Sequence, residues 1–168
     1  MDVLTYVPSN VVLLLSGYQI QGWNTIKVTK NAPVFKQIRG IRGKNTRTRI
    51  KDSSATISIE VPQTELLNEV MSKCLEADLQ TGTVRLDITL REITGTSFFN
   101  TTTGYLTAYP ELSYSNGLAN NTWILSCDDS QISIGCARSA AVGIVQDGVS
   151  RLKDFVSSAS DRLDGLLN

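Results

Sequence analysis

Residues 38–61 read IRGIRGKNTRTRIKDSSATISIEV, and this stretch decides the fold class. Its last part, Ala55–Val61, alternates strictly between apolar and polar side chains. A period of two is typical of a strand with one buried face. The part before Asp52 carries closely spaced cations and two glycines. We predict a strand, a basic turn and a second strand, which together form a long hairpin that contacts another copy of the protein.

Charge is spread unevenly along the chain. The formal net charge is zero, from 16 basic and 16 acidic residues. Nine of the basic residues precede Asp52, and Asp2 is the only acid before that point. Such asymmetry favours a nucleic-acid-binding patch or self-association of a basic with an acidic region, and a solvated basic face is the third interpretation. The candidate inter-subunit contacts in this basic arm (Arg39–Lys51) are Arg39, Arg42, Lys44, Arg47 and Arg49.

Nucleic-acid binding by the basic arm is the main alternative. Its cations can bind phosphates through charge alone. However, no aromatic residue is interleaved among Arg39–Arg49, whereas surfaces for single strands use aromatic stacking. The segment Gly40–Thr46 lacks the Ser or Thr that follows the lysine of a phosphate loop, and it leads toward a strand rather than a helix. A nucleic-acid-binding module therefore stays as the less favoured interpretation.

The remaining pattern as far as Cys127 predicts a mainly β domain with one flanking helix. Apolar residues recur at spacings of three and four over about Gln63–Leu79, which is typical of an amphipathic helix, and Gly82 follows its end. The apolar stripe of this helix consists of Leu66, Leu67, Val70, Met71, Cys74 and Leu75. Val84–Arg91 and Phe98–Tyr109 are joined by a short glycine-containing loop and predict a hairpin. Further strands are expected at Val11–Leu15, Thr25–Lys30, Val34–Ile38 and Thr122–Cys127.

The pattern changes near Ser139. Apolar residues then follow a 3-4 spacing to the end of the chain, which predicts a C-terminal amphipathic helix. This helix either docks on its own domain or faces a partner. The chain is accordingly divided into a β domain, residues 1–138, and a helical extension, residues 139–168. The expected partner seam consists of Val145, Val149, Leu152, Val156 and Leu163.

The composition argues against an enzyme. The chain has no histidine, so Ser-His-Asp and Cys-His catalysis and histidine-ligated metals are excluded. Its paired carboxylates come without a base, a nucleophile or a metal-ligand set. We therefore expect no catalytic, cofactor-binding or metal-binding residue and no cofactor. Three cysteines without a CxxC motif favour a reducing compartment, and neither a signal peptide nor a membrane-spanning segment is expected.

The order of these features resembles the tail tube protein of contractile-tailed bacteriophages, over roughly residues 10 to 128. The similarity lies in four blocks, and their order and spacing carry it more than any single block. The blocks are Leu15–Trp23; Gly40–Arg49 followed by Asp52–Ile59; Val61–Asn68; and Gly82–Leu90 followed by Tyr105–Pro110. R-type pyocin tubes and the haemolysin-coregulated protein of type VI secretion share that fold.

The resemblance implies a β-barrel or sandwich of the tail-tube type and a structural role in a virion tail. Homohexameric rings would stack into an inner tube that conducts DNA without binding it specifically. The sheath and the baseplate or terminator proteins would be further partners, and assembly would take place in the host cytoplasm. A tube initiator or terminator is the alternative to the main tube subunit. The extension after Ser139 departs from the family pattern.

Under this resemblance the polar faces of the alternating strands would line the lumen, and acids near the predicted helix would accept the basic arm of the next ring. The expected lumen-facing residues are Thr56, Ser58, Glu60, Arg85, Asp87, Thr89 and Arg91. The candidate acceptors are Glu65, Glu69, Glu76 and Asp78.

Overall fold

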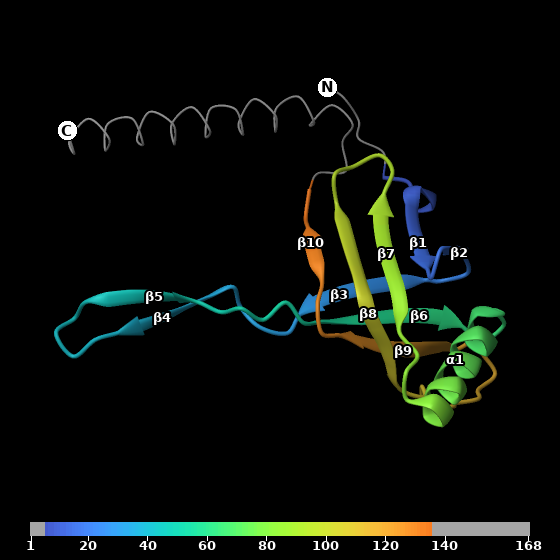
Figure 1. Cartoon of the computed structure of the whole chain (residues 1–168). Coiled ribbons are helices and arrows are strands. Elements are labelled where there is room, and N and C mark those ends of the chain that lie inside the picture. Colours follow the sequence, from blue (N-terminus) through green and yellow to red (C-terminus); the bar gives the residue numbers. More distant parts are fainter. Residues whose placement is uncertain (1–5, 136–168) are drawn as a thin grey trace, which may run out of the picture.

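The computed structural model describes residues 6–135, which form a curved antiparallel sheet, one α-helix and a projecting two-stranded hairpin (Figure 1). The C-terminal helix, its seam (Val145, Val149, Leu152, Val156, Leu163) and the domain boundary at 138 lie outside the described residues. In chain order the elements are η1 (Pro8–Asn10), β1 (Val11–Leu15), β2 (Tyr18–Ile20), β3 (Thr25–Lys30), β4 (Phe35–Arg39), β5 (Asn45–Arg49), β6 (Ala55–Pro62), α1 (Leu67–Thr81), β7 (Leu86–Glu92), β8 (Phe98–Ala108), β9 (Asn120–Cys127) and β10 (Gln131–Ser133).

The main sheet has eight strands in the order β2-β1-β7-β8-β9-β6-β3, with β10 paired to the start of β8. The sheet has two halves whose strands cross at a large angle. One half contains β1, β7 and β8, and the other contains β3, β6 and β9 (Figure 1). The register shifts between Leu86 and Ile88 in β7 and between Leu106 and Ala108 in β8. Such bulges bend strands, so they let one sheet fold over its own core. The predicted mainly β fold with one flanking helix is confirmed.

The core fills the space between the two halves of the sheet and α1. The alternating strand β6 contributes one buried side chain at every second position, as its sequence predicts. Trp123 of β9 is the largest fully buried side chain. From α1, Leu67, Met71 and Leu75 enter the core. Burial of this apolar surface is the dominant favourable term in folding.

The helix begins at Leu67, four residues later than the sequence predicts. Pro62 still pairs with Asn120 at the end of β6, and the N–H of Glu65 donates to the carbonyl of Pro62 (3.1 Å) in a turn. The side chain of Asn68 also donates to the Pro62 carbonyl (2.7 Å), which fixes where the helix starts. At the other end Gly82 adopts a left-handed conformation (φ 66°) and ends the helix, as expected.

The predicted pairing around residues 38–61 is wrong in one respect. Strand β6 does not pair with the basic arm but lies between β3 and β9. Strands β4 and β5 pair with each other instead and form the separate hairpin. Thr25–Pro62 is therefore one long ribbon, whose base belongs to the sheet and whose tip projects from it (Figure 1).

Within residues 6–135 the structure contains no helix with the length and apolar character needed to cross a membrane.

Candidate assembly surface

Five residues join β4 to β5, and a hydrogen bond between Gly40 and Lys44 leaves a three-residue loop, residues 41–43, at the tip of the hairpin. Gly43 donates its N–H to the carbonyl of Gly40 (2.9 Å), and Gly40 donates to the carbonyl of Lys44 (2.8 Å). Gly43 has a φ of 78°, a conformation that glycine adopts without steric cost. This is the type I turn with a glycine bulge that is common in three-residue hairpin loops. The loop places Ile41 and Arg42 at the end of the hairpin, where Ile41 is fully exposed.

One face of the hairpin is cationic. Directly opposite residues share a face, and the pairs on this one are Phe35 with Arg49, Gln37 with Arg47, and Arg39 with Asn45. The Arg47 guanidinium carbon lies 4.3 Å from the centre of the Phe35 ring, a cation–π contact. The sequence alone does not reveal this aromatic partner, because Phe35 is separated from Arg47 along the chain and only the pairing register brings them together.

The opposite face of the hairpin, named the aliphatic face below after Ile38, carries this isoleucine, two threonines and one lysine. Its directly opposed pairs are Lys36 with Thr48 and Ile38 with Thr46. All residues of both strands are exposed, so neither face is covered by the rest of residues 6–135. The cations predicted as contacts are thus divided: three arginines, Arg39, Arg47 and Arg49, share the first face, and Arg42 and Lys44 lie in the connection between β4 and β5.

The hairpin has an excess of positive charge, and the residues that follow it in the described chain have an excess of negative charge. Residues 34–51 contain seven cations and no acid, whereas residues 53–135 contain ten acids and three cations. Within residues 6–135 both ion pairs, Glu69–Lys73 and Asp78–Arg85, lie outside the hairpin. Opposite charges on separate parts of one chain favour association between copies.

A polar cluster fixes the base of the hairpin to the sheet. The Lys30 ammonium donates to the Ser53 carbonyl (2.8 Å) and to the carbonyl and Oγ of Ser130 (2.9 and 2.8 Å). Ser53 Oγ donates to Asp129 Oδ1 (2.7 Å). Because these groups come from three distant segments, the cluster sets the direction in which the hairpin leaves the body. Sequence reasoning missed it, since no local pattern links Lys30 to residues so far away.

Asp52 forms a turn beside this cluster. The Ser54 N–H donates to Asp52 Oδ1 (2.9 Å), and this bond, followed by the one from the Ser54 side chain, lowers the pKa of Asp52. A depressed folded-state pKa contributes stability above the ordinary pKa of the carboxyl. That contribution is lost as the pH falls through the lowered value.

Replacing Lys30 with methionine is expected to loosen the base of the hairpin. Methionine keeps the aliphatic stem but removes the donor, so the carbonyls of Ser53 and Ser130 lose their charged partner. The expected loss is about 1–3 kcal/mol in the free energy of unfolding, with faster amide exchange in β4 and β5. Urea unfolding and hydrogen exchange measure both effects. Lys27→Met on the exposed face of the same strand is the control, and equal losses in the two variants would contradict a special role for Lys30.

The predicted acidic acceptors lie around α1, at the other end of β6 from the hairpin (Figure 1). Glu69 pairs with Lys73 (2.8 Å), and the hydrogen bond from Lys73 lowers the pKa of Glu69. Asp78 Oδ1 accepts the N–H of Val84 (2.9 Å) and lies 3.9 Å from Arg85 Nη1, so it holds α1 to the segment just before β7. Glu65 and Glu76 are exposed. The exposed carboxylates Glu65, Glu69 and Glu76 are therefore better acceptors than Asp78.

The residues predicted to line a lumen lie on two separate parts of the sheet. Thr56, Ser58 and Glu60 alternate with buried residues of β6 and face away from the core. Asp87, Thr89 and Arg91 do the same on β7, which is separated from β6 by β8 and β9. Arg85 precedes β7, and its guanidinium carbon lies 5.4 Å from the centre of the Tyr105 ring. Their position in a lumen stays a prediction.

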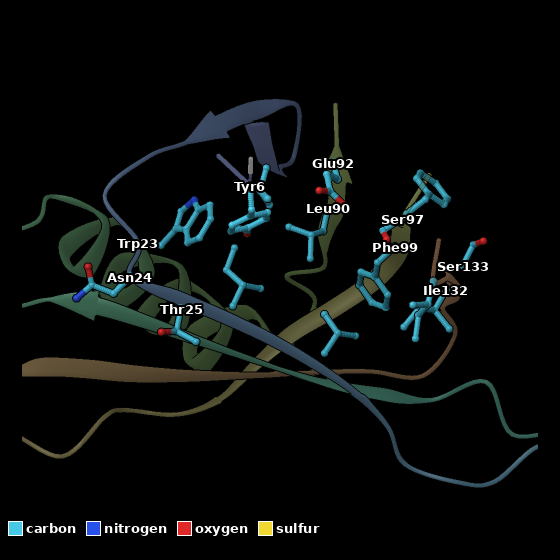
Figure 2. Close-up of a pocket in the computed structure, with 15 residues that line it drawn as sticks. Tyr6, Trp23, Asn24, Thr25, Leu90, Glu92, Ser97, Phe99, Ile132 and Ser133 are labelled. Carbon is cyan, nitrogen blue, oxygen red and sulfur yellow. The ribbon is translucent and has the colours of Figure 1, made fainter. Parts of the chain in front are cut away.

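An apolar cavity of about 430 Å³ opens where the inner side of β3 faces β7, β8 and β10 (Figure 2). Trp23, Leu90, Phe99 and Ile132 surround it, and Glu92 is the only carboxylate among its fifteen lining residues. No group of three or more potential metal ligands occurs within residues 6–135. The cavity is thus an open seam between sheet edges, with little acid–base chemistry in its walls.

Comparison with known proteins gives likeness in structure but not in sequence. No protein-family model matches the chain, and no curated protein matches it either. The tube-terminating cap of the anti-feeding prophage matches with a TM-score of 0.55 and 14% identity, over 79% of this chain and 94% of that chain.

Two further matches come from PVC, an extracellular contractile injection system in its extended state. A chain of the sheath–tube complex has a TM-score of 0.54 and 16% identity, over 77% of this chain and 91% of that chain. A chain of the sheath/tube terminator has a TM-score of 0.50 and 15% identity, over 80% and 100% of the two chains. The chain therefore has a fold related to contractile tail tubes. The likeness is to injection systems and does not single out bacteriophages.

Proposed function

We propose that this chain is a structural subunit that assembles into the tube of a contractile tail or injection system. The observation that carries the proposal is the uncovered basic hairpin at one end of a body whose other end presents exposed acids. A contact between unlike ends of one chain is heterologous and generates rings or open-ended stacks. The fold shared with tube and terminator components supports the same conclusion.

The sheet edges supply a second contact. Among the described strands β3 pairs with β6 alone and β2 with β1 alone, so each has one free edge. Free edges invite pairing with another chain, and closure into a ring satisfies them. Six copies per ring, as the resemblance to tail tube proteins implies, would stack through the hairpins. Sheath, baseplate and terminator proteins would contact this tube, as part of a tail assembled in the host cytoplasm.

The mixed charges of the outward faces of β6 and β7 suit a lumen through which a cargo passes. Strong phosphate binding comes from a concentration of cations. Glu60 and Asp87 stand on the same faces as the neutral Thr56 and the cation Arg91, so DNA or another polyanion would pass without being held. In a bacteriophage this cargo would be the genome, and the particle would be a virion. A role as an enzyme is not part of the proposal.

A tube terminator is the second candidate. Two of the three similar structures described above are a tube-terminating cap and a sheath/tube terminator. A terminator closes a stack and does not extend it, so it forms rings but no long tubes.

The mass of the purified full chain in solution tests the proposal. Sedimentation velocity should show a species of about six times the 18.3 kDa chain mass, or larger polymers. Rings that never elongate would support the terminator. A monomer or dimer with salt-dependent affinity for DNA would contradict the proposal and favour the nucleic-acid-binding module.

Deletion of residues 139–168 is expected to leave ring formation intact. The described core draws its side chains from residues 13–127, so the truncated chain should fold without the extension. Sedimentation of the truncated chain measures this. Insoluble or unfolded protein would show that the extension belongs to the core.

A further inference from the structure

We infer that the aliphatic face of the β4–β5 hairpin anchors it on a second copy of this chain, at an exposed apolar ridge on α1. This inference rests on the proposed function and names the surface on each side of the contact. The cationic face then orients the hairpin and does not supply most of its affinity.

The hairpin exposes large aliphatic side chains, which a basic arm that only contacts solvent would not be expected to carry. Ile38 is 53% exposed, Val34 is 60% exposed, and Ile41 stands uncovered at the tip. A two-stranded ribbon without a covering layer is marginally stable in water. Val34, Ile38 and Ile41 are spaced along the hairpin and rimmed by polar residues, such as Lys36 and Thr48. Exposed apolar residues rimmed by polar ones mark interaction sites. The aliphatic face therefore needs a cover that the described part of the chain does not provide.

Helix α1 presents a surface that matches this face. Leu66 and Val70 are four residues apart, so they lie one above the other, and they are 71% and 42% exposed although the sequence predicts them in the core stripe. Glu65 and Glu69 neighbour this ridge along the chain. An apolar ridge with acids beside it complements an apolar face with cations beside it.

The apolar cavity between β3, β7, β8 and β10 is the alternative surface for the hairpin, and it is less complementary to it. It is apolar and open, but Glu92 alone among its lining residues carries a carboxylate. A hairpin with seven cations would find little charge complementarity there. The ridge on α1 is the better match, because acids lie beside it.

The contact joins different copies. Strand β6 separates the base of the hairpin from the turn before α1, and its eight residues span about 26 Å. The hairpin extends from the end of the body opposite α1 (Figure 1). One copy thus offers its hairpin to one neighbour and its helix to another, which is a head-to-tail contact.

A contact held by buried aliphatic side chains and a contact held by charge differ in how assembly depends on salt. Charges across an interface mainly steer association and fix orientation, whereas a few buried apolar anchors carry affinity. In 1 M salt the screening length falls to about 3 Å, so an assembly held by charge alone dissociates. An assembly anchored by Ile38 and Ile41 persists.

The test compares full-length variants in an assembly titration followed by light scattering. Ile38→Ser with Ile41→Ser, and separately Leu66→Ser with Val70→Ser, should each raise the concentration required for assembly at least about tenfold. The combined variant should be little worse than either pair, because groups that share a contact are not additive. Leu118→Ser, at an exposed residue of the β8–β9 connection, is the matched control.

Thermal unfolding of each variant shows that the subunit stays folded, since all substituted residues are exposed. If the wild type assembles and the hairpin variant or the helix variant assembles at the same concentration as the wild type, this contact is overturned and the proposed function stands. Fully additive losses would also overturn it, because the two surfaces would then meet different partners. A wild-type chain that never assembles would overturn the proposed function itself.

Discussion

Replacing both Arg42 and Arg47 with glutamate is expected to abolish tube growth and leave the subunit folded. Both side chains are exposed on the hairpin, and neither takes part in an ion pair within residues 6–135. Reversal places negative charge where the hairpin meets the carboxylates near α1, and like charges across an interface cost several kcal/mol. Negative-stain images of the purified variant should show rings or single subunits but no tubes.

Two further variants separate charge from misfolding. Arg42→Gln with Arg47→Gln removes the attraction without adding repulsion, so its tubes should be shorter and their length should depend less on salt. Glu65→Arg with Glu69→Arg, mixed with the reversed hairpin, should restore growth if these surfaces meet. Tubes of normal length from the Arg42→Glu, Arg47→Glu variant would contradict a role of the hairpin between rings.

Substitution of Gly104 by valine is expected to destabilise the sheet strongly. Gly104 is buried in β8 opposite Leu86, where the register of β7 shifts. A Cβ at this position would lie 2.9 Å from the Leu86 carbonyl oxygen and 2.6 Å from Ile88 Cδ1. The backbone oxygen cannot yield without breaking the strand pairing. The cost should reach about 3 kcal/mol, the upper end of the usual range for overpacking.

Urea unfolding of Gly104→Val measures this loss. Gly117→Val is the matched control, because a Cβ there meets nothing within 4 Å. If both variants unfolded at the same urea concentration as the wild type, the close approach of β7 and β8 at Gly104 would be wrong.

The sequence predicts the elements whose side chains alternate or repeat. Every second residue of β6 is buried, as the pattern of Ala55–Val61 requires, and Gly82 ends the helix. Pairing was harder to predict, because the partners of β6 come from both sides along the chain and no local signal specifies them. Strand β5 was expected only as part of a basic turn, since Asn45–Arg49 contains no apolar residue to give a period of two.

The site was predicted as a set of cations, and the structure adds their arrangement. The sequence shows that Arg39–Arg49 is basic but not that Arg39, Arg47 and Arg49 share one face, because this depends on the loop length set by Gly43. It also assigns Leu66 and Val70 to the core stripe, whereas α1 turns a narrower stripe inward. Long-range contacts such as those of Lys30 are fixed only once the strands are in place.

Cryo-electron microscopy of the purified, untagged full-length chain tests the central claim most directly. Assembly into a tube predicts ring-shaped class averages with six-fold symmetry that stack end to end. In these rings the β4–β5 hairpin of each subunit should reach the next copy near α1. Images that show only separate subunits, even at the highest concentration at which the protein stays in solution, would contradict assembly into a tube.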